Sequence, residues 1–262
     1  MLTEAELRAY DRDGFLFPRT ALTSDEAADC RDRFHNFAVQ FGEEARGRGQ
    51  MTKRPHLILQ WVADLARHRS IIDAVEDIIG PDILCWFSAF FVKEGGSKRF
   101  VSWHQDGEYA VTSDRSVSAW VALTPATMEN GCMRFLPGSH RSLLTHQESY
   151  HPDNILTRGQ TIVGVDEGSG VEVVLAPGQF ALFHGNMAHG SSPNTSPQDR
   201  IGLVFRYVAG DGYETQPGYE SATLIRGADH AGKLELEPIP STDFDPAAIA
   251  THARICGMTY SQ

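Results

Sequence analysis

A histidine and an aspartate lie two positions apart in the segment Trp103-His104-Gln105-Asp106. In a β-strand, residues i and i+2 point to the same face, so His104 and Asp106 would present an imidazole and a carboxylate side by side. Two such side chains can chelate one metal ion, although an H-x-D pair also arises often by chance. A metal site at this position therefore needs a third ligand from elsewhere in the chain.

His189 is the candidate for that third ligand. It lies in the segment 182–191, which follows a predicted strand, is rich in glycine and small residues, and places His189 85 positions after His104 (189 − 104). Two histidines and one carboxylate on one face of a metal leave three positions open, which is the ligand set typical of non-haem iron(II) oxygenases. A structural zinc site would close its fourth position with another protein ligand, whereas a zinc hydrolase using the same three residues is an alternative.

Arg200 is a candidate anchor for a carboxylate. It begins a predicted strand, residues 201–208, in which Arg200 and Arg206 share one face. A guanidinium matches a carboxylate through two parallel hydrogen bonds, so Arg200 can hold the far carboxylate of a keto diacid that chelates iron through its other end. The alternative for either arginine is an ordinary ion pair at a surface or interface.

These residues belong to four motifs whose order resembles the phytanoyl-CoA dioxygenase family. The motifs are WHQD at 103–106, NGCMRFLPGSH at 130–140, HGSSPN at 189–194, and Arg200 eleven positions after His189 (200 − 189). By analogy of element order, the resemblance covers the chain from about residue 10 to about residue 207. It implies a double-stranded β-helix, the cupin-like jelly roll, flanked by N-terminal helices.

The resemblance also implies a set of site residues. The implied iron(II) ligands are His104, Asp106 and His189. The implied contacts of the co-substrate 2-oxoglutarate are Arg200, Ser191, Trp120, Ala89 and Lys53. His140, in the Pro-Gly-Ser-His turn, is expected to be structural, and His184 fits neither the Gly-Ser context nor the spacing to the arginine.

Asp106 decides between two reactions within the resemblance. Halogenating relatives have glycine or alanine at this position, which opens a coordination site for halide, whereas this chain keeps the carboxylate. We therefore expect hydroxylation by O2, with release of succinate and CO2, and no side-chain general acid or base is required. The alternatives are desaturation, cyclisation or epimerisation by a related enzyme, and a non-catalytic cupin-like binding protein.

The organic substrate is expected to be a small molecule. Candidate substrate contacts are His56, Glu108, Arg206 and Arg226. Arg226 can meet an acidic group of the substrate, or it can pair with Asp229 or Glu220 instead, and Glu108 can meet an amine. The chain shows no basic cluster suited to the phosphates of coenzyme A.

The first eighty residues predict helices that lie against the sheet. Thr3 with Glu6 and Thr23 with Glu26 are capping-box pairs, and Ser70 is a candidate cap for a third amphipathic segment. Gly80-Pro81 should end that helix. After this point the texture changes to short β-branched and aromatic runs separated by Gly and Pro, which is typical of a sandwich or barrel.

The predicted strands are 83–92, 117–123, 132–136, 171–175, 179–183 and 201–208. We expect 171–175 and 179–183 to form a hairpin across Pro177-Gly178. Residues 145–170 and 210–240 read as long loops, either binding lids or surface connections, and residues 243–253 as a short helix. The chain thus predicts one domain over 1–262, with a helical part at about 1–80, a jelly-roll core at about 83–208, and a C-terminal lid or tail at about 209–262.

The composition and net charge of the chain limit the kinds of partner that we expect it to bind. The net charge of −11 argues against nucleic acid, and no run of eighteen apolar residues predicts a membrane span. The N-terminus lacks the apolar region of a signal peptide, and the four cysteines are too scattered for a disulfide framework or a zinc cluster. These features predict a cytoplasmic protein.

Overall fold

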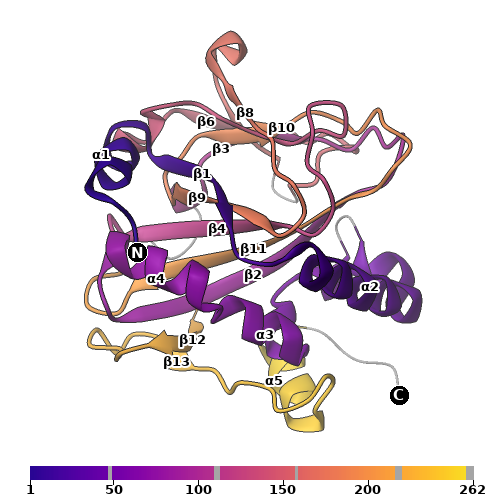
Figure 1. Cartoon of the computed structure of the whole chain (residues 1–262), viewed down its shortest axis with the longest axis vertical. Helices are drawn as coiled ribbons and strands as arrows, with labels where there is room; N and C mark the ends of the chain where they lie inside the picture. The colour runs from indigo at the N-terminus through magenta and orange to yellow at the C-terminus, as the bar shows by residue number, and fades with distance from the viewer. Residues whose placement is uncertain (47–48, 109–112, 157–158, 216–219, 258–262) are drawn as a thin grey trace.

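Two β-sheets lie face to face at the centre of the computed structural model, which describes residues 1–46, 49–108, 113–156, 159–215 and 220–257 (Figure 1). The large sheet has the order β1 (Phe15–Thr20), β9 (Gln179–His184), β4 (Ser116–Ala122), β11 (Arg200–Ala209), β2 (Ile83–Lys93), β12 (Ser221–Arg226) and β13 (Glu235–Leu236). The small sheet has the order β3 (Val101–His104), β10 (His189–Ser191), β5 (Met133–Phe135) and β8 (Val171–Val173). β6 (His146–Glu148) and β7 (Gln160–Ile162) form a separate pair. The double-stranded β-helix expected from the sequence is confirmed.

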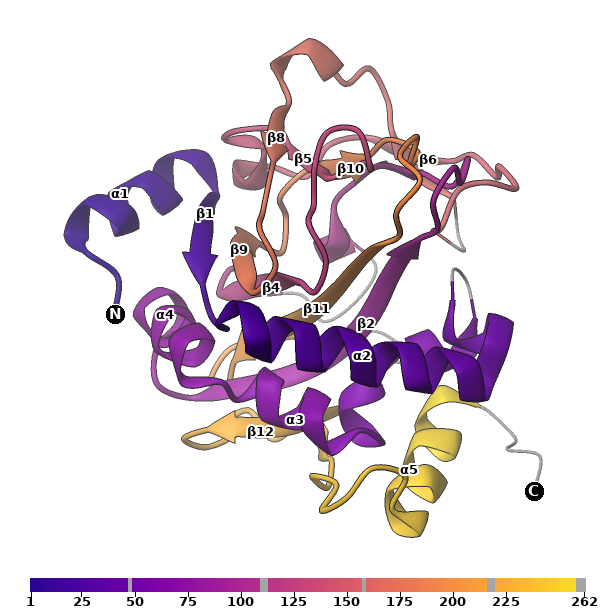
Figure 2. The same ribbon diagram turned by 45° about the vertical axis from the view of Figure 1, so that its right-hand side comes forward.

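The α-helices lie around the large sheet, mainly on the face that points away from the small sheet. They are α1 (Glu4–Asp13), α2 (Ser24–Phe41), α3 (Gln60–Ala66), α4 (Arg69–Ile79) and α5 (Pro246–Cys256). Figure 2 shows α2 and α3 running across this side of the sheet, with α5 beside them. Within the described part of the chain, no helix combines the length and apolar content needed to cross a membrane.

Both predicted capping boxes form, with Thr3 and Thr23 each accepting a hydrogen bond from the backbone of the glutamate three residues on. The predicted stop at Gly80 is also confirmed. The predicted cap at Ser70 is wrong, because α4 begins one residue earlier and His68 occupies the N-cap position without a side-chain cap.

One strand was missed in the helical N-terminal part. β1 pairs antiparallel with β9 at the edge of the large sheet. Its sequence contains Pro18, which lacks a backbone N–H and therefore argues against a central strand. At an edge the missing donor is tolerated, which is why proline can occur here.

The predicted hairpin across Pro177-Gly178 is wrong. β8 pairs with β5 in the small sheet, whereas β9 pairs with β1 and β4 in the large sheet. The Gly178 N–H donates to the carbonyl of Ala122, so the turn already belongs to the large sheet. The Pro-Gly turn therefore carries the chain from one sheet to the other.

The large sheet extends beyond the predicted core boundaries on both sides. β12 and β13 lie inside residues 210–240, and β6 and β7 lie inside residues 145–170, both of which were expected to be loops. β12 pairs antiparallel with the outer edge of β2 and parallel with β13. The segment 223–227, expected as part of a lid, thus begins in a sheet strand.

Strand β11 separates two apolar cores. Ile201, Leu203 and Phe205 pack against the helices, where Phe34 also contacts the sheet. Val204, on the opposite face, packs between the two sheets in a second cluster. This alternation is the pattern predicted from the sequence, and it directs Arg200 and Arg206 towards the space between the sheets.

Candidate metal centre and co-substrate pocket

His104 and His189 are direct cross-strand partners of β3 and β10 in the small sheet. Cross-strand partners point to the same face, so the antiparallel pairing brings together two imidazoles that are 85 residues apart in the chain. Their ring centroids lie 4.1 Å apart. Asp106 follows β3 at the start of a short 3₁₀ turn, η4 (Asp106–Glu108), and its carboxylate completes the group.

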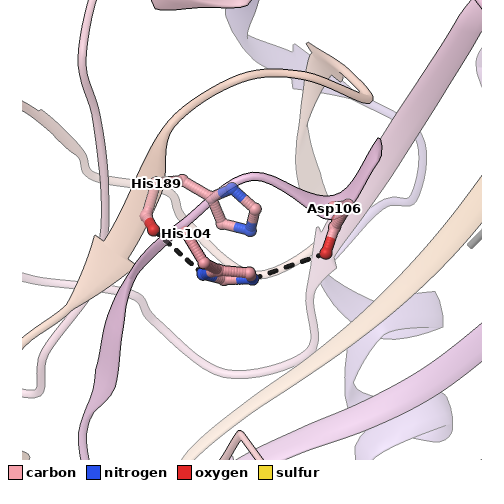
Figure 3. A group of neighbouring side chains, drawn as sticks. All are labelled: His104, Asp106 and His189. Atoms are coloured by element: carbon pink, nitrogen blue, oxygen red, sulfur yellow. Dashed lines mark hydrogen bonds and ion pairs between the residues drawn. The ribbon is translucent and has the colours of Figure 1, made fainter. Parts of the chain in front are cut away.

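The three side chains can share one ion. One ligand atom from each lies within 4.8 Å of the others, and all three residues are buried (Figure 3). Among the described residues, these are the histidine, cysteine and acidic side chains that form such a group. The three predicted metal ligands therefore come together in space.

The hydrogen bonds of the histidines leave the right nitrogens open. His104 Nδ1 lies 2.9 Å from the Ser102 carbonyl and 3.1 Å from the His189 carbonyl, and His189 Nδ1 lies 2.9 Å from the Met187 carbonyl. A carbonyl only accepts, so each Nδ1 carries the proton and each Nε2 keeps its lone pair for a metal. Burial and the neighbouring His104 lower the pKa of His189 to about 3, which keeps this imidazole neutral.

Asp106 has one oxygen without a protein partner. Its Oδ1 lies 2.7 Å from the Arg206 guanidinium and 3.4 Å from His104 Nε2, whereas its buried Oδ2 makes no hydrogen bond. Burial by itself would raise the pKa of Asp106, but Arg206 and His104 outweigh it and hold the pKa well below its ordinary value. An ionised carboxylate with a buried free oxygen beside two open imidazole nitrogens fits a divalent cation.

A single pocket is lined by His104, His189 and Arg200, and Asp106 lines a neighbouring pocket that shares Arg206 with it. Besides the two histidines, the polar lining of the first pocket is Ser191, Arg200 and Arg206, and its remaining walls are apolar or aromatic. Arg200 is buried, donates from Nη1 to the Gly131 carbonyl at 2.6 Å, and keeps its Nε without a partner. A buried guanidinium with an unused donor fits a carboxylate.

The indole ring of Trp120 lies against the Arg200 guanidinium. The guanidinium carbon lies 5.4 Å from the centroid of the indole, so the cation rests over the ring. The indole packs across Gly202 of the neighbouring strand, where any Cβ would overlap the ring. The predicted proximity of Trp120 to the pocket follows from this missing side chain.

Lys53 and Ala89 form an isolated antiparallel β-bridge. Bridge partners project to the same face of a sheet, and Ala89 packs with Trp120 and Val204 between the sheets. The Lys53 ammonium lies near the protein surface and donates to Gln50 Oε1 at 3.2 Å. The fold thus places these two predicted residues side by side, but neither of them lines the pocket that contains Arg200.

The position of His56 does not support its predicted substrate contact. It lies in η3 (Pro55–Leu57) on the helix side of the large sheet, with Nδ1 2.6 Å from Ser88 Oγ and Nε2 3.3 Å from Glu237. Glu237 also pairs with the buried Arg54 and accepts from Thr223 at 2.8 Å. His56 is therefore part of a buried polar network that holds the C-terminal part of the chain.

Of two further predicted substrate residues, Arg226 lies away from the pocket, and the side chain of Glu108 is not described. Arg226 pairs with Asp73 at 3.0 Å and with Glu76, both on α4, so its predicted pairing with Asp229 or Glu220 is wrong. The misplacement arose because β12 was not recognised as a strand beside α4. Glu108 ends η4, and its side chain lies outside the described part of the structure.

Other histidines lie outside the metal group. His184 approaches the Asp114 carbonyl at 3.1 Å and accepts from the Asn186 N–H at 3.0 Å, in keeping with its expected exclusion from the site. Its ring lies 5.4 Å from that of His140.

Gln105, between two of the ligands, was missed by the sequence reasoning. Its fully buried amide donates to the carbonyls of Ser139, Ser142 and Asn186, and its Oε1 accepts from the Leu144 N–H at 2.8 Å. The side chain therefore joins the H-x-D segment to the turn that leads into His189. Nothing in its residue type distinguishes it from an exposed glutamine.

Comparison with known proteins decides the family. A sequence profile described as phytanoyl-CoA dioxygenase matches residues 10–202. The chain belongs to the phytanoyl-CoA dioxygenase family. It is accordingly a non-haem iron, 2-oxoglutarate-dependent oxygenase, as the site geometry indicates.

Individual relatives agree with this family. An ectoine dioxygenase from Streptomyces avermitilis is 26% identical over 263 residues, covering 91% of this chain and 88% of the relative. The apo structure of a non-haem monooxygenase, ThoJ, is 30% identical with a TM-score of 0.81, covering 95% of this chain and 96% of the other. A nickel complex of ThoJ gives a TM-score of 0.79 at 29% identity.

Proposed function

We propose that this protein hydroxylates a small organic molecule at an iron(II) held by His104, Asp106 and His189, consuming 2-oxoglutarate and O2. The observation that carries the proposal is that His104 and His189 belong both to a buried group with the free carboxylate oxygen of Asp106 and to a pocket lined by Arg200, whose guanidinium keeps a free donor. When bound, iron and 2-oxoglutarate supply the oxidising chemistry, with succinate and CO2 as by-products.

The protein's own residues would bind and orient. His104 and His189 present Nε2 because backbone carbonyls hold each Nδ1–H. Asp106 fills the third position, and Arg206 fixes its orientation through Oδ1. These contacts predefine the metal geometry, which is the main contribution a protein makes to such a reaction.

The far end of the co-substrate would meet Arg200 and Ser191, with Trp120 beneath the guanidinium. The rest of the pocket wall contains Phe91 and Phe183, so water is excluded from its apolar side. Retention of the Asp106 carboxylate favours hydroxylation over halogenation, because no ligand position is vacated for a halide.

The organic substrate is proposed to be a small molecule in the cytoplasm. Arg206 lines the same pocket as His104 and His189 and is therefore a candidate contact for such a molecule. Ectoine is a rational first candidate because a relative is named ectoine dioxygenase. Amino acids and other polar metabolites complete the panel of candidate substrates to be tested.

An anaerobic titration tests the proposal directly. Fe(II) followed by 2-oxoglutarate should produce a visible charge-transfer band in the wild-type protein, and Asp106→Ala should bind iron more weakly and lose hydroxylation. Succinate release should then depend on Fe(II), O2 and one member of the substrate panel. Zinc-dependent hydrolysis without succinate, or full succinate release by Asp106→Ala, would show that the assignment is incorrect.

A further inference from the structure

Lys93 is a fully buried lysine beside the proposed co-substrate anchor. It ends β2 and is the direct cross-strand partner of Arg200 at the start of β11. Partners in a sheet project to the same face, so both cations enter the space between the sheets. Lys93 is not among the site residues predicted from the sequence.

The two cations converge on the same backbone. Lys93 Nζ donates to Ser191 Oγ at 2.6 Å, to the Ser192 carbonyl, and to the Gly131 carbonyl at 3.4 Å. Arg200 Nη1 donates to that same Gly131 carbonyl at 2.6 Å. The segments 131 and 191–192 therefore hold both positive groups close together.

No carboxylate balances this pair among the residues that the structure describes. The acidic group that acts on both is the Cys132 thiol, whose own pKa is raised to about 12 by burial and by Glu172, so it stays neutral. Buried cations without a counter-charge are unfavourable. Burial and the neighbouring Arg200 therefore lower the pKa of Lys93 while the pocket is empty, and an anion that enters beside Arg200 favours the protonated ammonium form.

Lys93 also determines what Ser191 can do. An ammonium group has three donors and no acceptor, so at Ser191 it occupies a lone pair of the hydroxyl oxygen. The single hydroxyl proton of Ser191 must then point to another acceptor. Since Ser191 and Arg200 line the same pocket, that proton is available to a carboxylate lying against Arg200.

We propose that Lys93 is a positioning residue that sets the specificity of the pocket for a 2-oxo dicarboxylate. It orients the Ser191 hydroxyl as a donor and adds a second positive charge beside Arg200, so that the far carboxylate of the co-substrate is recognised. This inference rests on the proposed function and deepens it. A 2-oxo acid without a far carboxylate gains nothing from Lys93.

The test compares two ligands on the nickel-loaded protein, which does not turn over. Binding of 2-oxoglutarate and of 2-oxobutanoate is measured by calorimetry for wild type and Lys93→Met, whose side chain has similar length without charge. We expect Lys93→Met to lose about 10- to 100-fold in affinity for 2-oxoglutarate, the scale of a hydrogen bond involving a charged group. Binding of 2-oxobutanoate should change less than about two-fold, well under the 1.4 kcal/mol of a tenfold effect.

Matched variants separate this role from a structural one. Lys98→Met, an exposed lysine five positions on, should leave both affinities unchanged. In a Ser191→Ala background, Lys93→Met should lose most of its effect, because the lysine acts through that hydroxyl. If Lys93→Met does not fold, Lys93→Gln, which retains a donor, should show the same ligand-selective loss at smaller size.

Two results overturn the inference. Unchanged 2-oxoglutarate affinity in Lys93→Met excludes the role, and an equal loss for both acids reveals a general structural effect. If wild type binds neither acid with nickel present, the proposed function itself fails, and this inference fails with it.

Discussion

The Asp106 carboxylate lies 2.7 Å from the Arg206 guanidinium, a residue from the other sheet. This ion pair spans the two sheets at the metal centre and leaves the second carboxylate oxygen free. The Arg206 guanidinium is itself held over the rings of Trp86 and Phe87, at 5.6 and 5.0 Å from their centroids. The orientation of a proposed metal ligand thus depends on aromatic side chains of β2.

Replacing Arg206 by methionine should weaken metal binding. The variant loses the contact that orients Asp106 and lets the pKa of that carboxyl rise, and a lost partner of a ligand typically costs about 10- to 100-fold in affinity. Calorimetric titration with Mn(II) measures this. Arg134→Met is the matched control, because Arg134 also lies over a tryptophan, Trp103, but pairs with Glu167 and Glu172. Equal losses in both variants would contradict the role given to Arg206.

Adding one methyl group at Gly202 should displace Trp120. In Gly202→Ala the new Cβ overlaps the indole, so Arg200 loses its support and 2-oxoglutarate binding should weaken by at least about tenfold. Trp fluorescence reports the displacement and calorimetry the affinity. Gly212→Ala is the control, because its Cβ would meet only Arg115 at an ordinary 3.5 Å. Unaltered affinity with altered fluorescence would separate Trp120 from co-substrate binding.

Removing the amide of Gln105 should destabilise the fold around the ligands. Gln105→Leu leaves buried carbonyls and the Leu144 N–H without their partner, at about 1–3 kcal/mol for each buried group left unsatisfied. Urea unfolding should show a lower free energy of unfolding, and Mn(II) affinity should fall as well. Gln147→Leu, exposed on β6, should change neither quantity. A stable variant with normal metal affinity would rule out this joining role.

The buried Lys93 should make the free energy of unfolding depend on pH. Burial, aided by Arg200, lowers the pKa of Lys93 from its ordinary 10.5 to about 5 in the folded protein. Between these values the unfolded chain binds more protons, so this group makes the free energy of unfolding rise with pH across that window. In Lys93→Met this contribution disappears, so the variant should gain stability relative to wild type as the pH falls below about 10, with the largest gain near pH 5 and below. Urea unfolding at several pH values checks the slope, with Lys98→Met expected to follow wild type.

The sequence was sufficient for the metal centre because its ligands lie in short local motifs. The short H-x-D spacing keeps His104 and Asp106 together although Asp106 lies in the turn after β3 and not in the strand, and the alternation along β11 correctly directed Arg200 inward. The cross-strand pairing of His104 with His189 could only be expected from the family resemblance. Motif reading thus worked where function is encoded within a few residues.

Other features depend on partners that a local pattern does not specify. Lys93 follows an apolar run, where a lysine usually marks the exposed end of a strand, and only its pairing with Arg200 shows that it is buried. β12 was read as loop although it lies in the large sheet, between β2 and the short edge strand β13. Likewise, His56 was predicted to contact the substrate, but its Nε2 lies 3.3 Å from Glu237, which is 181 positions away in the chain.

The buried Glu237 network has a consequence for how the protein is made. Arg54 lies 183 positions before its partner Glu237. The segment that carries Lys53 and Arg54 therefore cannot make this contact until Glu237 has left the ribosome. Contacts of such long sequence separation form slowly, because a large loop must close first. We expect a nascent chain that already contains all three proposed ligands to remain incompletely folded along the edge of β2 until Glu237 becomes available.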